Sequence, residues 1–239
     1  MIYFELNSKK YIFVHIPKTA GTSIKKAIFN NFKSYINLTE SKKNNVYKYT
    51  NSIDAHAPIS FIKTRLIDHS IYFIVIVRNP WARMFSLFQH TLMRKNTNKP
   101  NLLLSNLNLD TRSKYSKNFE NIALNEINKI GIKNIKECFE FWLFFIGRNK
   151  DIIPLGNPNF NLLPQEWWFL EDKLLSKNII FFQYEKLLDL ESYLRVSIKK
   201  ENKSSFDSNS FYSKVYNSKT KDYVSNLDSW VIKKFNYSF

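Results

Sequence analysis

Short apolar runs along this chain alternate with segments in which apolar residues recur at helical spacing. The first run, residues 11–14, stops at Pro17. Apolar side chains then recur in the helical pattern, at Ile24, Ala27, Ile28 and Phe32. A buried strand gives such a run, and a helix with one buried face gives such a spacing. This part of the chain therefore predicts a strand, a loop and a helix.

The same order of elements recurs from residue 71. Residues 71–77 are an apolar run that ends at Arg78-Asn79-Pro80, and proline is favoured in the first turn of a helix. The apolar positions that follow have a period near 3.6, at Trp81, Met84, Phe85, Phe88 and Leu92. A short amphipathic segment at 59–66 precedes this second strand, loop and helix.

The rest of the chain continues the alternation. Its pattern predicts helices at 119–130, 135–145 and 184–196, a short helix after the Pro- and Asn-rich segment 154–164, a strand at 178–182, and a C-terminal helical segment. Strands that alternate with helices favour an α/β fold with a mostly parallel central sheet flanked by helices. We expect a single domain over residues 1–239.

The net positive charge of the chain favours anionic binding partners. The 239 residues include 36 Lys and Arg against 20 Asp and Glu, a formal charge of +16. A positive field attracts nucleic acid, an anionic membrane surface or a polyphosphorylated small molecule without choosing among them. The basic residues are scattered and the aromatic ones fall in apolar runs, which argues against a nucleic-acid-binding module.

Cysteine content and hydropathy exclude further classes. The single cysteine, Cys138, rules out an intramolecular disulfide and a zinc site of several cysteines. No set of His, Cys and carboxylate residues has ligand spacing, so we expect no metal. The longest apolar stretches fall short of the roughly 20 residues that span a bilayer, and the N-terminus lacks a signal-peptide pattern. We expect a soluble, cytoplasmic protein; its oligomeric state does not follow from the sequence.

The loop after the first strand has the chemistry of an anion site. It consists of His15-Ile16-Pro17-Lys18-Thr19-Ala20-Gly21-Thr22-Ser23. A loop between a strand and a helix directs backbone N–H groups and the positive end of the helix dipole towards the sheet edge. Gly21 permits close approach to the backbone, and Lys18 supplies a mobile positive charge. The hydroxyl groups of Thr22 and Ser23 add donors.

The order of residues in this loop argues against the nucleoside-triphosphate loop of kinases and ATPases. That loop needs Gly, four residues, and then Gly-Lys followed by Ser or Thr, whose hydroxyl group coordinates magnesium. Here Lys18 precedes Gly21, the only glycine of the loop. A nucleotide or small-molecule kinase on a related fold is the alternative function, and a basic nucleic-acid-binding module is a more distant one.

Residues 15–23 resemble, letter for letter, a loop of the sulfotransferase superfamily. The match is to its carbohydrate-type branch, sulfotransferase family 2, in which this loop binds the 5′-phosphosulfate of 3′-phosphoadenosine 5′-phosphosulfate (PAPS). The resemblance implies a P-loop-like three-layer sandwich and a PAPS-dependent O-sulfotransferase. It also implies that the donor is bound by Pro17, Lys18, Thr19, Ala20, Gly21, Thr22 and Ser23.

A second stretch, residues 77–86, is similar to the signature with which this branch binds the 3′-phosphate of the donor. The signature is an arginine that ends a strand and a serine on the next helix, which correspond to Arg78 and Ser86. An arginine can fork onto a phosphate, and Ser86 lies about two helical turns further on. Arg83 is a further candidate for this phosphate, but we favour an exposed helix arginine. Weaker resemblance covers 163–165, 183–187 and 224–239.

Sulfuryl transfer to an alcohol needs a base for the hydroxyl proton and positive charge at the departing phosphate oxygen. Histidine is the natural base near pH 7. In this branch the base is a His before a turn of small residues and Pro, and His56 within residues 54–58 is similar to it. His15, beside the loop, is the alternative. The predicted reaction is an in-line displacement in which His56 activates the acceptor and Lys18 stabilises the leaving oxygen.

The acceptor is predicted only as a class. The basic charge and the resemblance favour a hydroxyl of a carbohydrate, and small alcohols, lipids and tyrosine stay open. Residues 95–135 are expected to form a lid or an excursion on the acceptor side of the domain.

Overall fold

The computed structural model describes residues 1–32, 34–38, 56–64, 66, 70–92, 135–148, 163–171, 174–175, 178–199 and 212–239. The helix predicted at 119–130 lies outside the described residues, and so does the lid or excursion expected at 95–135 except for its last residue, Ile135. Contacts group the chain into two compact units. The first comprises Met1–Asn79, Gln165–Lys203 and Lys233–Asn236, and the second Pro80–Pro164, Ser204–Ile232 and Tyr237–Phe239. The single domain over 1–239 stays a prediction.

The first unit is built on a five-stranded sheet with the strand order β3-β1-β2-β4-β7. Its strands are β1 (Ile2–Leu6), β2 (Lys9–Val14), β3 (Tyr35–Asn37), β4 (Tyr72–Val77) and β7 (Ile179–Gln183). β2, β4 and β7 pair in parallel, whereas β1 is antiparallel to both of its neighbours. The predicted α/β class with a mostly parallel, helix-flanked sheet is confirmed, with β1 as the exception in direction.

A tight hairpin, which the sequence analysis did not place, joins β1 to β2. Leu6 pairs with Lys9, and the two residues between them, Asn7 and Ser8, have φ angles of 51° and 59°. Positive φ at both central residues is the geometry of a type I′ turn, whose twist matches that of the strands it connects. The hairpin gives β2 neighbours on both sides, so the loop after β2 starts from an interior strand.

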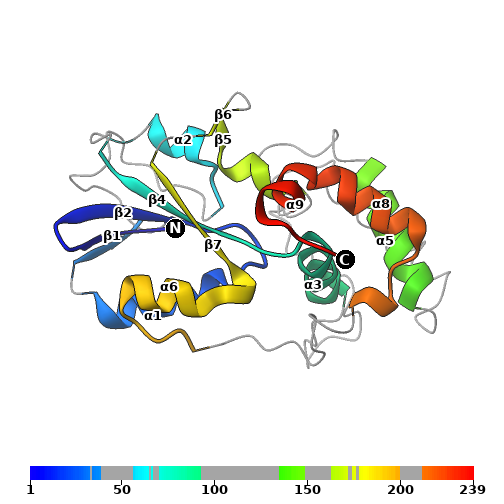
Figure 1. The fold of residues 1–239 in the computed structure, drawn as a ribbon, viewed down its shortest axis with the longest axis horizontal. Helices are drawn as coiled ribbons and strands as arrows, with labels where there is room; N and C mark the ends of the chain where they lie inside the picture. The colour runs from blue at the N-terminus through cyan, green and yellow to red at the C-terminus, as the bar shows by residue number, and fades with distance from the viewer. Residues whose placement is uncertain are drawn as a thin grey trace, which may run out of the picture. The chain divides into compact units, whose positions relative to one another are not determined.

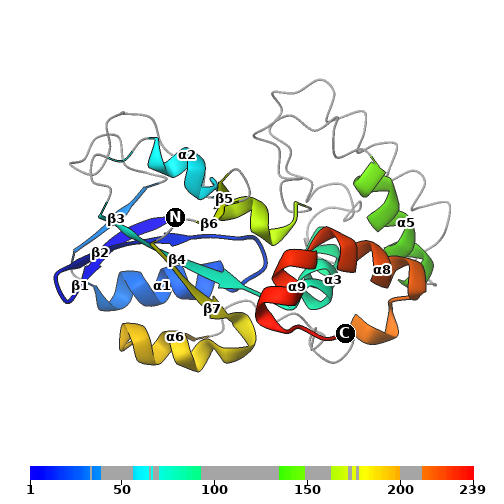
Figure 2. The ribbon, with the colours of Figure 1, turned by 45° about the horizontal axis from the view of Figure 1, so that its top comes forward.

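Helices cover both faces of this sheet (Figure 1). α1 (Gly21–Asn31) and α6 (Leu187–Leu194) lie on one face, and α2 (Ile59–Lys63) lies on the other, an arrangement that the second view repeats (Figure 2). Apolar side chains of α1 and α6 pack against alternate strand positions, in a cluster that includes Phe4, Phe13, Ile24, Ile28, Ile74, Ile76, Leu190 and Leu194. Residues 73–77 of β4 are at most 2% exposed, as expected for a parallel strand covered on both faces.

Four further short elements are described in the first unit. They are the 3₁₀ helices η3 (Gln165–Trp168) and η4 (Tyr184–Lys186) and the two-residue strands β5 (Leu170–Glu171) and β6 (Leu174–Leu175). η4 and α6 together confirm the helix predicted at 184–196, and β7 confirms the strand predicted at 178–182. η3 takes the place of the short helix expected after residue 164.

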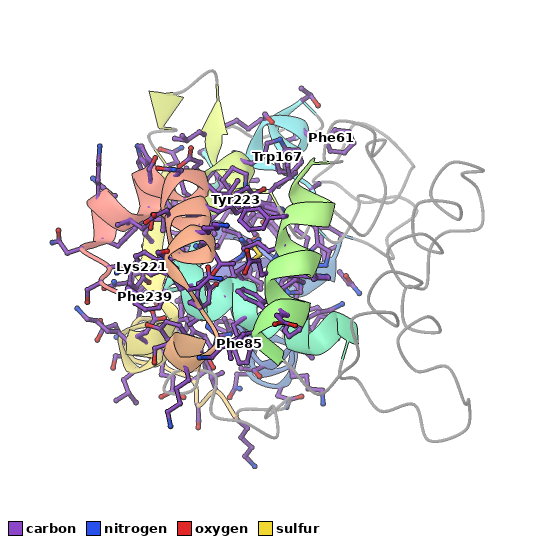
Figure 3. All side chains as sticks on the ribbon, turned by 90° about the vertical axis from the view of Figure 1, so that its right-hand side faces the viewer. Phe61, Phe85, Trp167, Lys221, Tyr223 and Phe239 are labelled. Carbon is purple, nitrogen blue, oxygen red and sulfur yellow. The ribbon has the colours of Figure 1, made fainter. Side chains whose placement is uncertain are left out.

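The described part of the second unit consists of helices around an aromatic core. They are α3 (Pro80–Leu92), α5 (Ile135–Arg148), the 3₁₀ helix η5 (Tyr212–Lys214), α8 (Ser218–Leu227) and the first part of α9 (Ser229–Phe235). The core includes Trp81, Phe85, Phe88, Phe139, Trp142, Tyr216 and Val224. At the edge of this unit Lys221 lies over the ring of Phe239, with Nζ 4.6 Å from its centroid (Figure 3). None of the helices described for the chain has the length and apolar character that crossing a membrane requires.

Arg83 on α3 corrects one expectation. Its side chain is 1% exposed, and Nη1 lies 3.7 Å from Oδ2 of the fully buried Asp228. A buried charge is tolerated where an opposite charge accompanies it. The prediction of an exposed helix arginine was wrong, because the partner lies 145 residues away along the sequence (228 minus 83) at the end of α8 and no local pattern indicates it.

Candidate functional site

The loop between β2 and α1 has an unusual backbone. Lys18 and Ala20, neither of which is glycine, have φ angles of 69° and 68° in the left-handed region. That conformation costs a non-glycine residue about 1–2 kcal/mol, so the surrounding contacts must enforce it. One such contact is made by Thr19, which is fully buried and donates from Oγ1 to the Ile16 carbonyl at 2.9 Å. The Thr19 hydroxyl therefore shapes the loop from within.

α1 begins directly after this loop and carries no side-chain cap. Ala20 occupies the N-cap position, and the first turn has no acidic residue. The first N–H groups of a helix have no partner within the helix, and they form the positive end of its dipole. Thr22 is exposed in this first turn, whereas Ser23 is buried. A helix start of this kind suits an anionic group better than a protein side chain.

Gly21 is the contact point between the loop and a histidine. A Cβ at this position would overlap Cδ2 and Nε2 of the His15 ring. The sequence analysis assigned Gly21 to close approach of a ligand, and the close approach that the structure records is that of the His15 imidazole. Any larger residue here would have to displace the His15 ring, whatever the loop binds.

Arg78 joins the two sequence motifs. It follows β4 directly and is 4% exposed, and its Nη1 donates to the Lys18 carbonyl at 3.1 Å. The guanidinium also lies over the ring of Tyr184, with Cζ 4.2 Å from the centroid, a favourable cation–π distance. Two segments separated by 60 residues in sequence are thereby brought into one cluster of the first unit.

Two side chains hold the backbone next to the Arg78 side chain, a role that sequence reasoning assigned to neither of them. Gln165 is fully buried, accepts the N–H of Arg78 at Oε1 and donates from Nε2 to its carbonyl, each at 2.9 Å. Glu185 Oε1 accepts the N–H of Asn79 at 2.9 Å. The resemblance at residues 163–165 and 183–187 was the available signal, and it gave no indication of what these residues contact.

His56 lies against the loop from the side of α2. Its Nδ1 is 2.8 Å from the carbonyl oxygen of His15, and the two imidazole centroids are 4.4 Å apart. A carbonyl can only accept, so Nδ1 of His56 carries the proton, and the lone pair of the neutral ring lies on Nε2. The carbonyl of His56 in turn accepts the indole N–H of Trp168 at 2.7 Å. His56 is thus held through both its ring and its backbone.

The electrostatic surroundings of His15 are positive. Burial lowers its pKa well below the usual value, and electrostatic interactions with His56, the N-terminus, Lys25 and Lys18 lower it further. His15 is therefore neutral at pH 7. Because Lys18 and Lys25 place positive charge near this loop, the local field would favour an anion bound here.

The remaining predicted residue, Ser86, belongs to the second unit. It lies on α3 and is 9% exposed. Its predicted role towards a 3′-phosphate stays a prediction. Within the described part of the chain, no three His, Cys, Asp or Glu side chains gather as metal ligands.

The comparison with protein families gives one result. The model described as "Sulfotransferase family" matches residues 4–236, which includes both motifs and nearly all of the chain. No curated protein and no solved structure matches the chain.

Proposed function

The chain belongs to the sulfotransferase family, and we propose that it transfers a sulfuryl group from PAPS to an acceptor hydroxyl, with a carbohydrate as the acceptor class. The observation that carries this proposal is the hydrogen bond of 3.1 Å from Arg78 Nη1 to the Lys18 carbonyl. A donor with a phosphate at each end of its ribose needs two anion-binding groups close together. The loop of residues 17–23 and the strand-end arginine supply them.

The residues of the first unit fit such a donor. The N–H groups at the start of α1 and the ammonium of Lys18 would hold the 5′-phosphosulfate, together with the loop residues Thr19 to Ser23. Arg78 would hold the 3′-phosphate, since a guanidinium pairs with phosphate in a planar, two-bonded geometry. The uncapped helix start and the positive surroundings of His15 are the features that favour negative charge. PAPS supplies an activated sulfuryl group to this site.

His56 is the proposed base. With Nδ1 donating to the His15 carbonyl, Nε2 is the nitrogen that accepts the proton of the acceptor hydroxyl. The hydroxyl oxygen then forms a bond to sulfur as the bond from sulfur to the phosphate oxygen breaks. The electron pair of that bond stays on the phosphate oxygen, where Lys18 and the loop N–H groups stabilise it. The products are a sulfate ester and adenosine 3′,5′-bisphosphate.

His15 is the weaker candidate for the base. Its ring packs against Gly21, and burial and neighbouring positive charge lower its pKa well below the usual range. A base is most effective when its pKa lies near the working pH. We therefore assign to His15 the role of holding His56 and shaping the loop, and to His56 the proton transfer.

Ligand-dependent melting tests the proposal without knowledge of the acceptor. Adenosine 3′,5′-bisphosphate at about 100 times its Kd stabilises the folded state by about 2.7 kcal/mol. For a chain of this size that stabilisation raises Tm by about 5–10 °C. A kinase would instead respond to ATP with magnesium, and a nucleic-acid binder would bind DNA with an affinity that falls steeply with salt. No shift with the bisphosphate, together with a shift by ATP and magnesium, would overturn the proposal.

Mass spectrometry of acceptor mixtures incubated with PAPS tests the acceptor class. The proposal expects a mass increase of one sulfuryl group on an oligosaccharide and none on tyrosine peptides or simple alcohols. A product only among the latter would reject the carbohydrate assignment and leave sulfuryl transfer intact.

A further inference from the structure

The 3₁₀ helix η3 contacts the backbone of two residues that the proposed function needs. Gln165 at its start bonds to Arg78, and Trp168 at its end bonds to His56. Both side chains are fully buried. Arg78 and His56 come from different places in the sequence, and a four-residue turn from a third place lies against both.

The contact at Gln165 reproduces the hydrogen bonds of a neighbouring strand. Its amide accepts from the N–H and donates to the C=O of the same residue, Arg78, at 2.9 Å each. Arg78 is the first residue beyond β4, where the ladder with β7 ends at the pair Val77 and Gln183. The side chain of Gln165 therefore satisfies both backbone hydrogen-bonding groups of the first residue after β4 and fixes the backbone from which the guanidinium projects.

The contact at Trp168 fixes a different group. Its Nε1 donates to the His56 carbonyl at 2.7 Å, and the His56 ring donates to the His15 carbonyl at 2.8 Å. The first of these bonds sets the position of the His56 backbone, and the second depends on that position. Loss of the indole donor therefore affects the ring through its backbone.

We propose that η3 is a positioning element in which Gln165 orients Arg78 for the 3′-phosphate of the donor and Trp168 orients His56 for proton transfer. This inference rests on the proposed function. Neither residue is catalytic, since each acts through the backbone of another. If both residues merely filled the core, their replacement would loosen Arg78 and His56 together. If they are positioning residues, replacement of Gln165 weakens binding of the 3′-phosphate and leaves His56 in place. Replacement of Trp168 changes the state of His56 and leaves binding of the 3′-phosphate intact.

Two substitutions separate these possibilities. Gln165→Met keeps the shape of the side chain and removes both hydrogen bonds, and Trp168→Phe keeps an aromatic ring and removes the donor. The first readout is the ratio of the Kd values for adenosine 5′-phosphate and adenosine 3′,5′-bisphosphate, which isolates the contribution of the 3′-phosphate. The second is the tautomer of His56, observed by ¹⁵N NMR of the histidine-labelled protein, which needs no acceptor.

We expect Gln165→Met to lower the affinity ratio roughly tenfold, because a guanidinium that is no longer held in place loses about 1.4 kcal/mol of its interaction with the 3′-phosphate. The NMR signature of protonated Nδ1 in His56 should be unchanged. Trp168→Phe should leave the ratio within about twofold and shift His56 from the Nδ1–H form towards a mixture of tautomers. In an Arg78→Ala background, Gln165→Met should lower the ratio no further, since the two residues act as one unit. Gln165→Glu, which retains the acceptor, should fall between wild type and Gln165→Met and serves if the latter does not fold.

Several outcomes would overturn the inference. Gln165→Met with a wild-type affinity ratio rules out its role towards Arg78. An unchanged His56 tautomer in Trp168→Phe rules out the other role. If each variant both lowers the affinity ratio and shifts the His56 tautomer to a similar extent, η3 is only part of the core. A wild-type protein that binds both nucleotides equally would instead reject the proposed function, and that result is read before any variant is made.

Discussion

The imidazole of His56 donates from Nδ1 to the carbonyl oxygen of His15 at 2.8 Å, although 41 residues separate the two in sequence. This bond decides which nitrogen of His56 carries the proton. It also connects the predicted base to the loop that is predicted to bind the donor. The backbone carbonyl of His15 therefore fixes the orientation of the His56 ring, and the His15 ring packs beside it.

Replacement of His56 with alanine should lower kcat by about 10²- to 10⁴-fold, the usual contribution of a general base. The affinity for adenosine 3′,5′-bisphosphate should stay close to wild type, because His56 is proposed to act on the acceptor. Turnover with PAPS and titration with the bisphosphate measure the two effects. A variant that retains near-native turnover would move the base to another residue, with His15 as the first to examine.

Replacement of Lys18 with alanine should lower kcat by about 10²- to 10³-fold, since it removes a charge from the oxygen that becomes negative during transfer. Lys199→Ala is the matched control, because it removes an exposed lysine of the same unit that lies outside the proposed site. The steady-state kcat of Lys18→Ala should be about 10²- to 10³-fold lower than that of Lys199→Ala. Equal rates would mean that Lys18 contributes only to the general positive field.

Gly21→Ala should destabilise the fold by about 1–3 kcal/mol, the usual cost of forcing atoms into a packed site, because its Cβ would overlap the His15 ring. His15→Ala removes that ring, so the same change at Gly21 should cost much less in the His15→Ala background. Denaturant unfolding of the four proteins gives the coupling energy. Strictly additive effects would show that the clash is relieved in another way.

The lowered pKa of His15 predicts a pH dependence of stability. Because the folded state binds this proton less readily than the unfolded state, the stabilising effect of neutral His15 is present above about pH 6.5 and is lost as the pH falls below it. His15→Phe keeps a flat ring and removes the titration. Between pH 6.5 and 5 its unfolding free energy should fall less steeply than that of wild type, by at most about 1.4 kcal/mol per pH unit.

The comparison of the two proteins is made by denaturant unfolding at each pH, with values at pH 8 as the reference for the loss of packing. Parallel curves for wild type and His15→Phe would show that His15 titrates normally in the folded protein.

Local pattern was sufficient for the main elements of the fold. The unbroken apolar run of β4 predicted a strand buried on both faces, and the helical spacing after Pro80 predicted α3, because each depends only on which residues face the core. The pattern did not predict β1, because the pairing of this strand depends on the hairpin turn at Asn7 and Ser8.

For the site, the sequence by itself indicated the loop of residues 15–23 and the strand-end Arg78, because their residue types and their places after strands carry the chemistry, and the resemblance to the sulfotransferase family indicated His56 as the candidate base. Only the tertiary structure decided that Arg78 bonds to Lys18, that Gln165 and Trp168 hold Arg78 and His56, and that Arg83 is buried beside Asp228. Hydrogen bonds between distant residues depend on how the strands and helices are packed. A one-dimensional pattern records which faces are buried and does not record which buried groups meet.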